Sequence, residues 1–356
     1  MRRLMIDYVK PDMVVARSIY YDGKVLLVKG SKLNEKYIQR LREVGFRSIY
    51  VEDFIADKEV VDLITDKTRL DAMATVKNSY KALERKATLN MKEISSSVNY
   101  ILDEVLSNRE VLLNLADIHS HDDYLLAHAT GVCVLSLATG LALGFTPAQM
   151  KELGVGALLH DIGMVGIDPA IINKPSNLTP EETVAMQKHP TIGFEVLRKY
   201  PEISTLSAHV AFQHHEKWRG DGYPRGMKGE EIHIYARIAS VADVFDALLS
   251  DRPYRNGYNN SQALTIISRM SSTYFDPFVF EAFASKIAIF PVGTIVKLNT
   301  GETAIVMEVR KKHPGQPLVK LLTDQYALPS TQLNDLDLLE NPSVFIVGVD
   351  ESYNPG

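Results

Sequence analysis

His160 and Asp161 stand side by side in the small, apolar stretch GALLHDIGMVG, and this pair constrains the chain more than any other feature. Buried charge is costly unless it is paired or bound to a metal, so the pair needs a partner. Further ligand-type residues lie on both sides of it. The set holds five His, two Asp and no Cys: His128, His160, Asp161, His189, His214, His215 and Asp243. Such a mixture suits Fe, Mn, Ni or Zn in a catalytic site rather than a structural zinc site.

The adjacent pairs strengthen this interpretation. Successive helix positions point about 100° apart, so His160 and Asp161 can meet one metal at a tight vertex or two metals through a bridging Asp. Asp243 lies in the apolar helix ARIASVADVFDALLS, and Asp246 shares its helix face three residues later. We expect Asp246 to orient a His ligand, with a solvated helix residue as the alternative. Two divalent cations outweigh two carboxylates, which leaves positive charge for a hydroxide and a phosphodiester oxygen.

The length of the chain and the changes in its sequence pattern predict several domains, because 356 residues suffice for two or three. Residues 1–65 predict a small α/β or β unit, in which Asn34–Val44 forms a helix closed by Gly45. Its expected strands are Met13–Ile19, Lys24–Val28 and Ser48–Val51, with a hairpin signal at Asp22-Gly23.

The two largest remaining segments differ in pattern. Residues 119–290 predict a mainly helical catalytic domain, where Thr179-Pro180-Glu181-Glu182 begins a helix expected to carry His189 near its end. Residues 291–356 alternate in short apolar runs separated by turn signals, which predicts a small β-rich domain of barrel or sandwich type.

Residues 66–118 predict a helical linker. Apolar residues repeat every seven positions at Met73, Tyr80, Ala87, Ile94 and Ile101. Val76 and Leu83 fit the accompanying d position, whereas Asn90, Ser97 and Glu104 do not. Two interpretations stay open: a homodimer formed through this helix, and a connecting helix that packs against its own domain.

The composition of the chain limits the classes of partner and the cellular locations that we expect. A formal net charge of -5 gives no broadly basic surface, so no DNA or RNA polymer is expected as partner. The single cysteine, Cys133, excludes a disulfide within the chain and suits a reducing compartment as a buried small hydrophobe. The start of the chain lacks a signal peptide's apolar stretch, and the apolar run Gly131–Phe145 is too short to span a membrane. We therefore expect a cytoplasmic protein without membrane contact.

Basic residues follow the ligand-bearing segments, at Lys174, Arg219, Arg225, Arg252 and Arg255. Arg suits forked contacts to phosphate, and Arg252 and Arg255 in SDRPYR are the best candidates. Ordinary solvated charge is the alternative for the others. The chain contains no G-x-S-x-G nucleophile motif and no Walker A sequence, which argues against serine hydrolase or P-loop chemistry.

A series of ordered motifs between Asp122 and Pro277 resembles the HD-GYP family, a branch of the HD-domain metal-dependent phosphohydrolases. The motifs are HDIG (160–163), Lys-Pro-x-x-Leu-Thr-x-Glu-Glu (174–182), His189-Pro190 with Gly193, HHEKWRGDGYP (214–224), VADVFDALLSDRPYR (241–255) and Phe275-Asp276-Pro277. The resemblance implies a mainly α fold with an HD-domain helical core. It also implies hydrolysis of cyclic di-GMP to pGpG, and in some members on to GMP, by hydroxide activated between two metals.

The same resemblance implies roles for individual residues. The five His and two Asp above become the ligands of two divalent cations, Fe or Mn in the first place, with Ni or Zn as alternatives in purified protein. Asp161 becomes their bridge and, with His160, the catalytic pair. Arg252, Arg255, Tyr223 and Lys174 become substrate contacts. The GYP loop, Gly222-Tyr223-Pro224, is linked in the family to contacts with diguanylate cyclase domains, while a tight turn is its plain structural explanation.

Two departures from the family pattern matter. Met164 stands where the family usually has a Lys that reaches substrate phosphate, and losing such a contact costs about 1.5–3 kcal/mol. Tyr124 stands where some members have a Glu that serves a third metal, so we expect two metals, with Asp122 as a nearby orienting group. A slow or inactive metal-loaded domain that senses cyclic di-GMP or binds partners stays open, as does a phosphohydrolase for another nucleotide.

Overall fold

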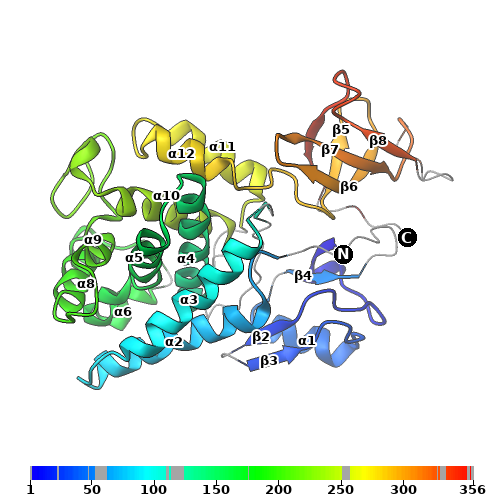
Figure 1. Ribbon diagram of the computed structural model, residues 1–356. Coiled ribbons are helices and arrows are strands. Elements are labelled where there is room, and N and C mark those ends of the chain that lie inside the picture. Colours follow the sequence, from blue (N-terminus) through cyan, green and yellow to red (C-terminus); the bar gives the residue numbers. More distant parts are fainter. Residues whose placement is uncertain are drawn as a thin grey trace.

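The computed structural model describes residues 2–21, 24–46, 48–52, 62–109, 112–113, 124–174, 176–250, 257–326, 328, 334–350 and 353. A large helical body occupies one side of the molecule, and a small N-terminal unit and a C-terminal sheet lie on the other (Figure 1). Each of the three has its own cluster of buried apolar residues. This arrangement confirms the predicted fold class, mainly α with a small α/β unit before the helical core and a β region after it.

The N-terminal unit joins two short ladders to one helix. β1 (Arg2–Met5) pairs with β4 (Ser48–Val51), and β2 (Ile19–Tyr21) pairs with β3 (Lys24–Leu27). α1 (Glu35–Glu43) begins at Asn34, whose side chain accepts a hydrogen bond from the Tyr37 amide. It is followed by Gly45 at φ 92°, a conformation that glycine adopts without penalty.

Two details of this unit differ from expectation. The strand predicted over Met13–Ile19 is largely wrong, because only Ile19 enters a strand, while Val14 and Val15 make isolated bridges. β1 was not predicted, since its short basic run forms a ladder only with residues far along the chain. Asp22 and Gly23 lie outside the described residues.

The linker is not one helix, so the continuous heptad interpretation is wrong. α2 (Asp66–Glu84) and α3 (Met91–Ser107) form a pair of adjacent helices (Figure 1). Lys86 adopts φ 55° between them, and Asn90 caps α3 by accepting from the Glu93 amide. Ile94 and Ile101 are buried in the large core, which favours helices that pack against their own domain. Dimerisation stays a prediction.

α4 (Tyr124–Ala142) is the central helix of the large body and contacts α2, α3, α5, α10 and α12. It is longer than the apolar run expected from the sequence, and it is long and apolar enough to meet a length and composition test for a membrane span. However, 78% of its apolar window is buried inside the protein, as in the core helix of a globular fold. Cys133 lies fully buried on this helix, as expected.

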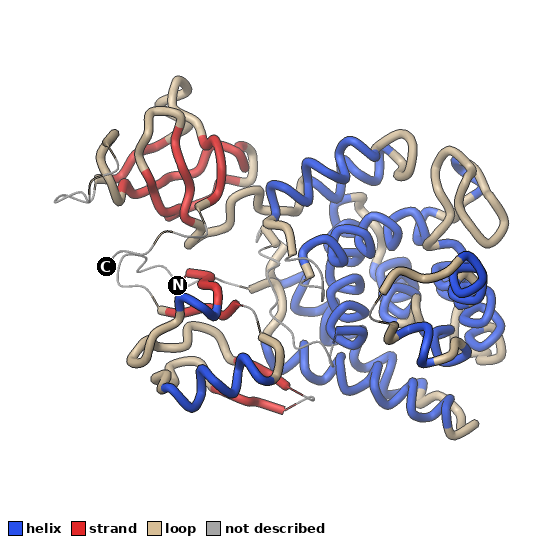
Figure 2. Tube along the Cα trace, turned by 180° about the vertical axis from the view of Figure 1, so that it is seen from behind, coloured by secondary structure: helices blue, strands red, loops and turns tan. Residues whose placement is uncertain are grey.

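The other elements of the helical body surround α4, and Figure 2 shows them from behind. They are α5 (Pro147–Leu158), η3 (Ile162–Gly166), α6 (Pro169–Ile172), α7 (Pro180–Met186), α8 (His189–Leu197), α9 (Thr205–Gln213), η4 (Gly229–Glu231), α10 (Ile234–Leu249), α11 (Asn260–Met270) and α12 (Pro277–Ala284).

The C-terminal region is an antiparallel sheet with the strand order β8-β7-β6-β5-β9. Its strands are β5 (Ile295–Leu298), β6 (Thr303–Arg310), β7 (His313–Leu321), β8 (Asp335–Asp337) and β9 (Ile346–Val349). Val296, Val306 and Val319 are fully buried in its core. The alternating apolar runs therefore form the β-rich region that they predicted.

Candidate metal centre

His160 and Asp161 lie just beyond a helix, not within one as expected. α5 ends at Leu158, and Asp161 immediately precedes η3. The turn brings Gly163 against α8: a Cβ atom on Gly163 would lie 2.0 Å from the His189 carbonyl oxygen and 2.4 Å from the Gly193 nitrogen. Only glycine permits this backbone approach, which places Asp161 beside His189.

His189 also occupies a helix boundary. α7 ends at Met186, and His189 is the first residue of α8, so the expectation that it ends the preceding helix is wrong. Pro190 explains the difference, because proline is readily accepted in the first turn of a helix. His189 Nδ1 donates to the Met186 carbonyl at 2.8 Å, which leaves Nε2 free to face the interior.

Two further imidazoles are held in the same way. His214 follows the last residue of α9, and its Nδ1 lies 3.1 Å and 3.0 Å from the carbonyl oxygens of Val210 and Ala211. His160 Nδ1 lies 2.8 Å from the Ala157 carbonyl oxygen. A carbonyl can only accept, so Nδ1 carries the proton in each ring and Nε2 presents a lone pair.

A carboxylate orients His128. Its Nδ1 lies 2.7 Å from Asp246 Oδ2, and its Nε2 lies 3.1 Å from Asp243 Oδ1. Both carboxylates come from α10, which packs on α4. A Cβ on Gly131 would lie 2.2 Å from Asp246 Oδ1, so this small residue makes room for the carboxylate. Asp246 thus has the orienting contact expected from its helix position.

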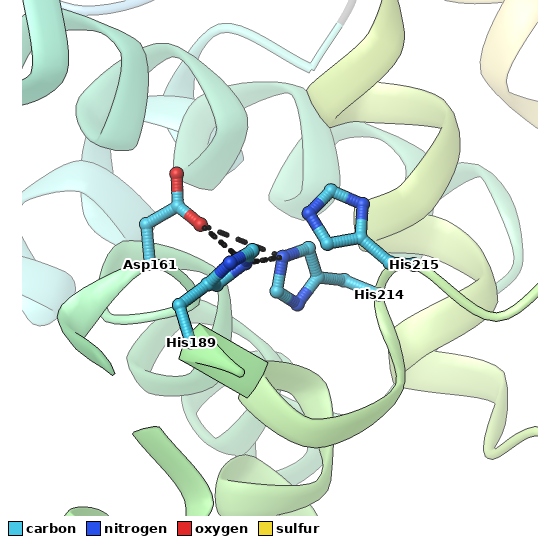
Figure 3. Close-up of side chains that lie close together, drawn as sticks. All are labelled: Asp161, His189, His214 and His215. Carbon is cyan, nitrogen blue, oxygen red and sulfur yellow. Dashed lines mark hydrogen bonds and ion pairs between the residues drawn. The ribbon is translucent and has the colours of Figure 1, made fainter. Parts of the chain in front are cut away.

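The ligand-type atoms converge in two groups, each with all atoms within 4.8 Å of one another: Asp161, His189, His214 and His215, and His128, His160 and Asp243. Figure 3 shows the first group, with Asp161 and His189 facing His214. Asp161 Oδ1 lies 3.3 Å from His189 Nε2, while its Oδ2 lies 3.3 Å from His160 Nε2 in the other group. Asp161 therefore contacts both groups, as a bridging carboxylate would.

Buried polar atoms without partners show that this set fits metal cations. His160 Nε2 and Asp161 Oδ1 are buried and have no hydrogen-bond partner among the described residues. His189 Nε2 lies only 3.4 Å from His214 Nε2, although both nitrogens are acceptors in the assigned tautomers. Such an arrangement is costly without a cation between the lone pairs. His–carboxylate sets of this kind suit Fe, Mn, Ni or Zn, so the residues present here fit divalent metal cations.

Electrostatics keep His189, His215 and Asp161 in metal-binding protonation states. Burial lowers the pKa of His189 to about 4, and burial together with His214 lowers the pKa of His215 well below its usual value. Burial opposes the charge on Asp161, but His160 and His214 outweigh it and hold the pKa of this carboxyl well below its ordinary range. Neutral imidazoles and ionised carboxylates are the forms that bind metal. Against the effect of burial, Tyr124 and Asp243 raise the pKa of His128, and Asp161 raises that of His160, so these two rings must release a proton to bind metal.

The GYP loop lies against the same centre. The Tyr223 ring lies 4.8 Å from the His215 ring, centre to centre, and its amide donates to the His215 carbonyl at 3.2 Å. Glu216, which sequence reasoning missed, is 2% exposed and accepts from the amides of Arg225 at 2.7 Å and Met227 at 2.9 Å. Its only sequence signal is its position beside His214-His215. The loop is therefore fastened directly to the ligand segment.

The other expected substrate contacts are placed differently. Lys174 pairs with Glu182 at 2.5 Å, so its ammonium already has an anionic partner. Met164 lies half-buried in η3, three residues after Asp161. Asp122, Arg252 and Arg255 lie outside the described residues.

Comparison with known families identifies two regions. The HD domain model matches residues 110–279, and the model of the KOW domain associated with HD domain matches residues 295–354. The first range contains every candidate ligand, and the second covers the C-terminal sheet. A solved HDGYP protein from Bdellovibrio bacteriovorus is 17% identical, with a TM-score of 0.49, and the match covers 79% of this chain and 97% of that one.

Two curated relatives share much of the chain. A cyclic di-GMP phosphodiesterase of Pseudomonas aeruginosa is 34% identical over 250 residues, which cover 70% of this chain and 60% of the relative. A cyclic di-GMP phosphodiesterase of Thermotoga maritima is 38% identical over 241 residues, covering 65% and 64%. The chain thus spans less than two thirds of either relative. With its HDIG and GYP segments, the chain is similar to the HD-GYP branch of HD-domain proteins.

Proposed function

We propose that this chain is a metal-dependent phosphodiesterase that hydrolyses cyclic di-GMP to pGpG, with GMP as a further product. The observation that carries the proposal is the pair of adjoining ligand groups that share contacts with Asp161. The names of the two curated relatives support the substrate. Two divalent cations, Fe or Mn in the first place, would lower the pKa of a water molecule and neutralise charge on the phosphate.

The protein's own groups divide the remaining tasks. His128, His160 and Asp243 would hold one cation, and Asp161, His189, His214 and His215 the other. The backbone carbonyls behind three imidazoles, and Asp246 behind His128, keep the binding nitrogens aimed inward. Tyr223 covers His215 at the edge of the site and would contact the substrate there.

The first test is product formation by protein purified without oxygen, with the metal content measured on the same sample. Two Fe or Mn ions per chain together with pGpG or GMP would support the proposal. Two bound metals without turnover, after Fe, Mn and Ni reconstitution, would favour a cyclic di-GMP sensor or partner-binding module instead. A substrate panel that includes 3′3′-cGAMP and linear dinucleotides tests whether the chain is instead a phosphohydrolase for another nucleotide. Faster turnover of one of these than of cyclic di-GMP would favour that alternative.

Asp161→Ala tests the site assignment itself. Removing Asp161 should abolish turnover and reduce the bound metal sharply, because this carboxylate contacts His160 of one group at 3.3 Å and His189 of the other at 3.3 Å. Asp335→Ala is the matched control, since this carboxylate is 58% exposed on the C-terminal sheet. An Asp161→Ala protein with two metals and full activity would refute the assignment.

The proposed partners follow from the same loop and linker. The GYP loop would present Tyr223 to diguanylate cyclase domains, and α2 and α3 would provide a homodimer contact. Pull-down with and without Gly222→Ala tests the loop, because a Cβ there would meet the Lys217 nitrogen at 2.4 Å and displace it. Sedimentation of the full chain tests the dimer.

A further inference from the structure

Tyr80 makes a contact that the proposed chemistry does not use. Its hydroxyl donates to the backbone carbonyl of Asp161 at 2.6 Å, although the two residues lie 81 positions apart in the chain. The same carbonyl accepts from the Met164 amide at 2.9 Å. Tyr80 therefore contributes one of the two hydrogen bonds found on the peptide group whose side chain touches both ligand groups.

The helix that carries Tyr80 also holds the N-terminal unit. α2 begins at Asp66, which lies close enough to Tyr20 of β2 that burial and this carboxylate raise the pKa of Tyr20 to about 12. Just before α2, Asp62 pairs with Arg17 at 2.6 Å, with side-chain exposures of 24% and 13%. Figure 1 shows β2 beside the start of α2.

α2 is uninterrupted between these two contacts. Tyr80 lies fourteen residues after Asp66, so the helix spans about 21 Å from the N-terminal unit to the metal centre. It packs against α3 and α4 along this length and against η3 near Tyr80. Rigid secondary elements carry energetic coupling between distant sites, so α2 can connect a change at its start to Asp161 at its other end.

We propose that Tyr80 is a positioning residue for the metal centre, and that α2 links the N-terminal unit to Asp161 through the Tyr80 hydroxyl. The inference rests on the proposed function only in taking Asp161 as a metal ligand. A change in the N-terminal unit that shifts α2 would then alter metal affinity without contacting a ligand.

Mn²⁺ titration of the full chain tests the first half. Tyr80→Phe removes one hydrogen bond and should weaken Mn²⁺ binding about 3- to 10-fold. Tyr200→Phe is the matched control, because its hydroxyl also bonds one backbone group, the Leu89 amide at 3.0 Å, away from Asp161. Both variants should lower the melting temperature of metal-free protein. Only Tyr80→Phe should change Mn²⁺ affinity and the visible spectrum of Co²⁺-loaded protein, which reports ligand geometry.

A double-mutant cycle tests the second half. Tyr20→Phe should weaken Mn²⁺ binding about twofold in otherwise unchanged protein and have no further effect in Tyr80→Phe. Tyr8→Phe, a tyrosine of the same unit that is 47% exposed, should change neither.

Wild-type affinity in Tyr80→Phe, or independent effects of Tyr20→Phe and Tyr80→Phe, would overturn the inference. Because every readout is metal binding, such a result leaves the phosphodiesterase proposal standing. Conversely, absence of hydrolysis with an intact Tyr80 effect would refute only that proposal.

Discussion

Gly163→Ala should separate the two backbones that build the metal centre. The added Cβ would lie 2.0 Å from the His189 carbonyl oxygen, whereas real Cβ contacts essentially never fall below 3.0 Å. η3 and α8 must therefore move apart by about 1 Å, since backbone atoms cannot rotate away. The distance of 3.3 Å between Asp161 Oδ1 and His189 Nε2 would open by a similar amount. Metal–ligand distances tolerate only about 0.2 Å, so the site should fail.

The measurement is metal content and cyclic di-GMP turnover, with thermal unfolding on the same protein. We expect a loss of about 1–3 kcal/mol in the free energy of unfolding, as for other overpacked sites, and at least tenfold lower turnover. Gly166→Ala is the control, because its Cβ would meet only the flexible Ile192 side chain, at 2.9 Å, on the same helix pair. Gly163→Ala protein with wild-type metal content would refute the close-approach argument.

Three further changes probe separate parts of the centre. Asp246→Asn should lower metal affinity about tenfold, because His128 loses the anion on its Nδ1; unchanged Mn²⁺ titrations would contradict this. Met164→Lys should tighten cyclic di-GMP binding about tenfold if the η3 side chain faces the phosphate, and a direct binding titration with equal affinities would exclude that orientation. In metal-free protein, His189 should stay neutral as the pH falls past 6.5 and gain its proton only near pH 4, because burial depresses its pKa; an imidazole NMR titration with a midpoint near 6.5 would show this wrong.

Local signals in the sequence were sufficient where one residue decides the structure. Thr179 caps α7 through a reciprocal contact with Glu182 as expected, and the helix predicted before Gly45 forms as α1. The ligand set was found in the same way, because His and Asp in apolar surroundings need a reason wherever the fold puts them. The structure brings all seven of these side chains together.

Helix boundaries and contacts between distant parts of the chain were harder to predict from the sequence. The heptad pattern continued through residues 85–90, where the structure turns, and the misfit at Asn90 was the signal of a new helix. Tyr80 appeared only as an apolar position in that pattern, since nothing local reveals a hydrogen bond to a carbonyl 81 residues away. Glu216 was overlooked for the same reason, because its partners are backbone amides of a loop.

The imidazoles of this centre differ in whether a substitution can remove the group that hydrogen-bonds their Nδ1 atom. His160, His189 and His214 each hydrogen-bond a backbone carbonyl of the preceding turn through Nδ1. Because every amino acid carries this carbonyl, no side-chain replacement at the supporting positions removes the partner. Among these four rings, only His128 is oriented by a side chain, that of Asp246. Natural variation or laboratory selection that adjusts metal preference without touching a ligand would therefore accumulate around α10, while the other three rings would loosen only if their helix ends unravel.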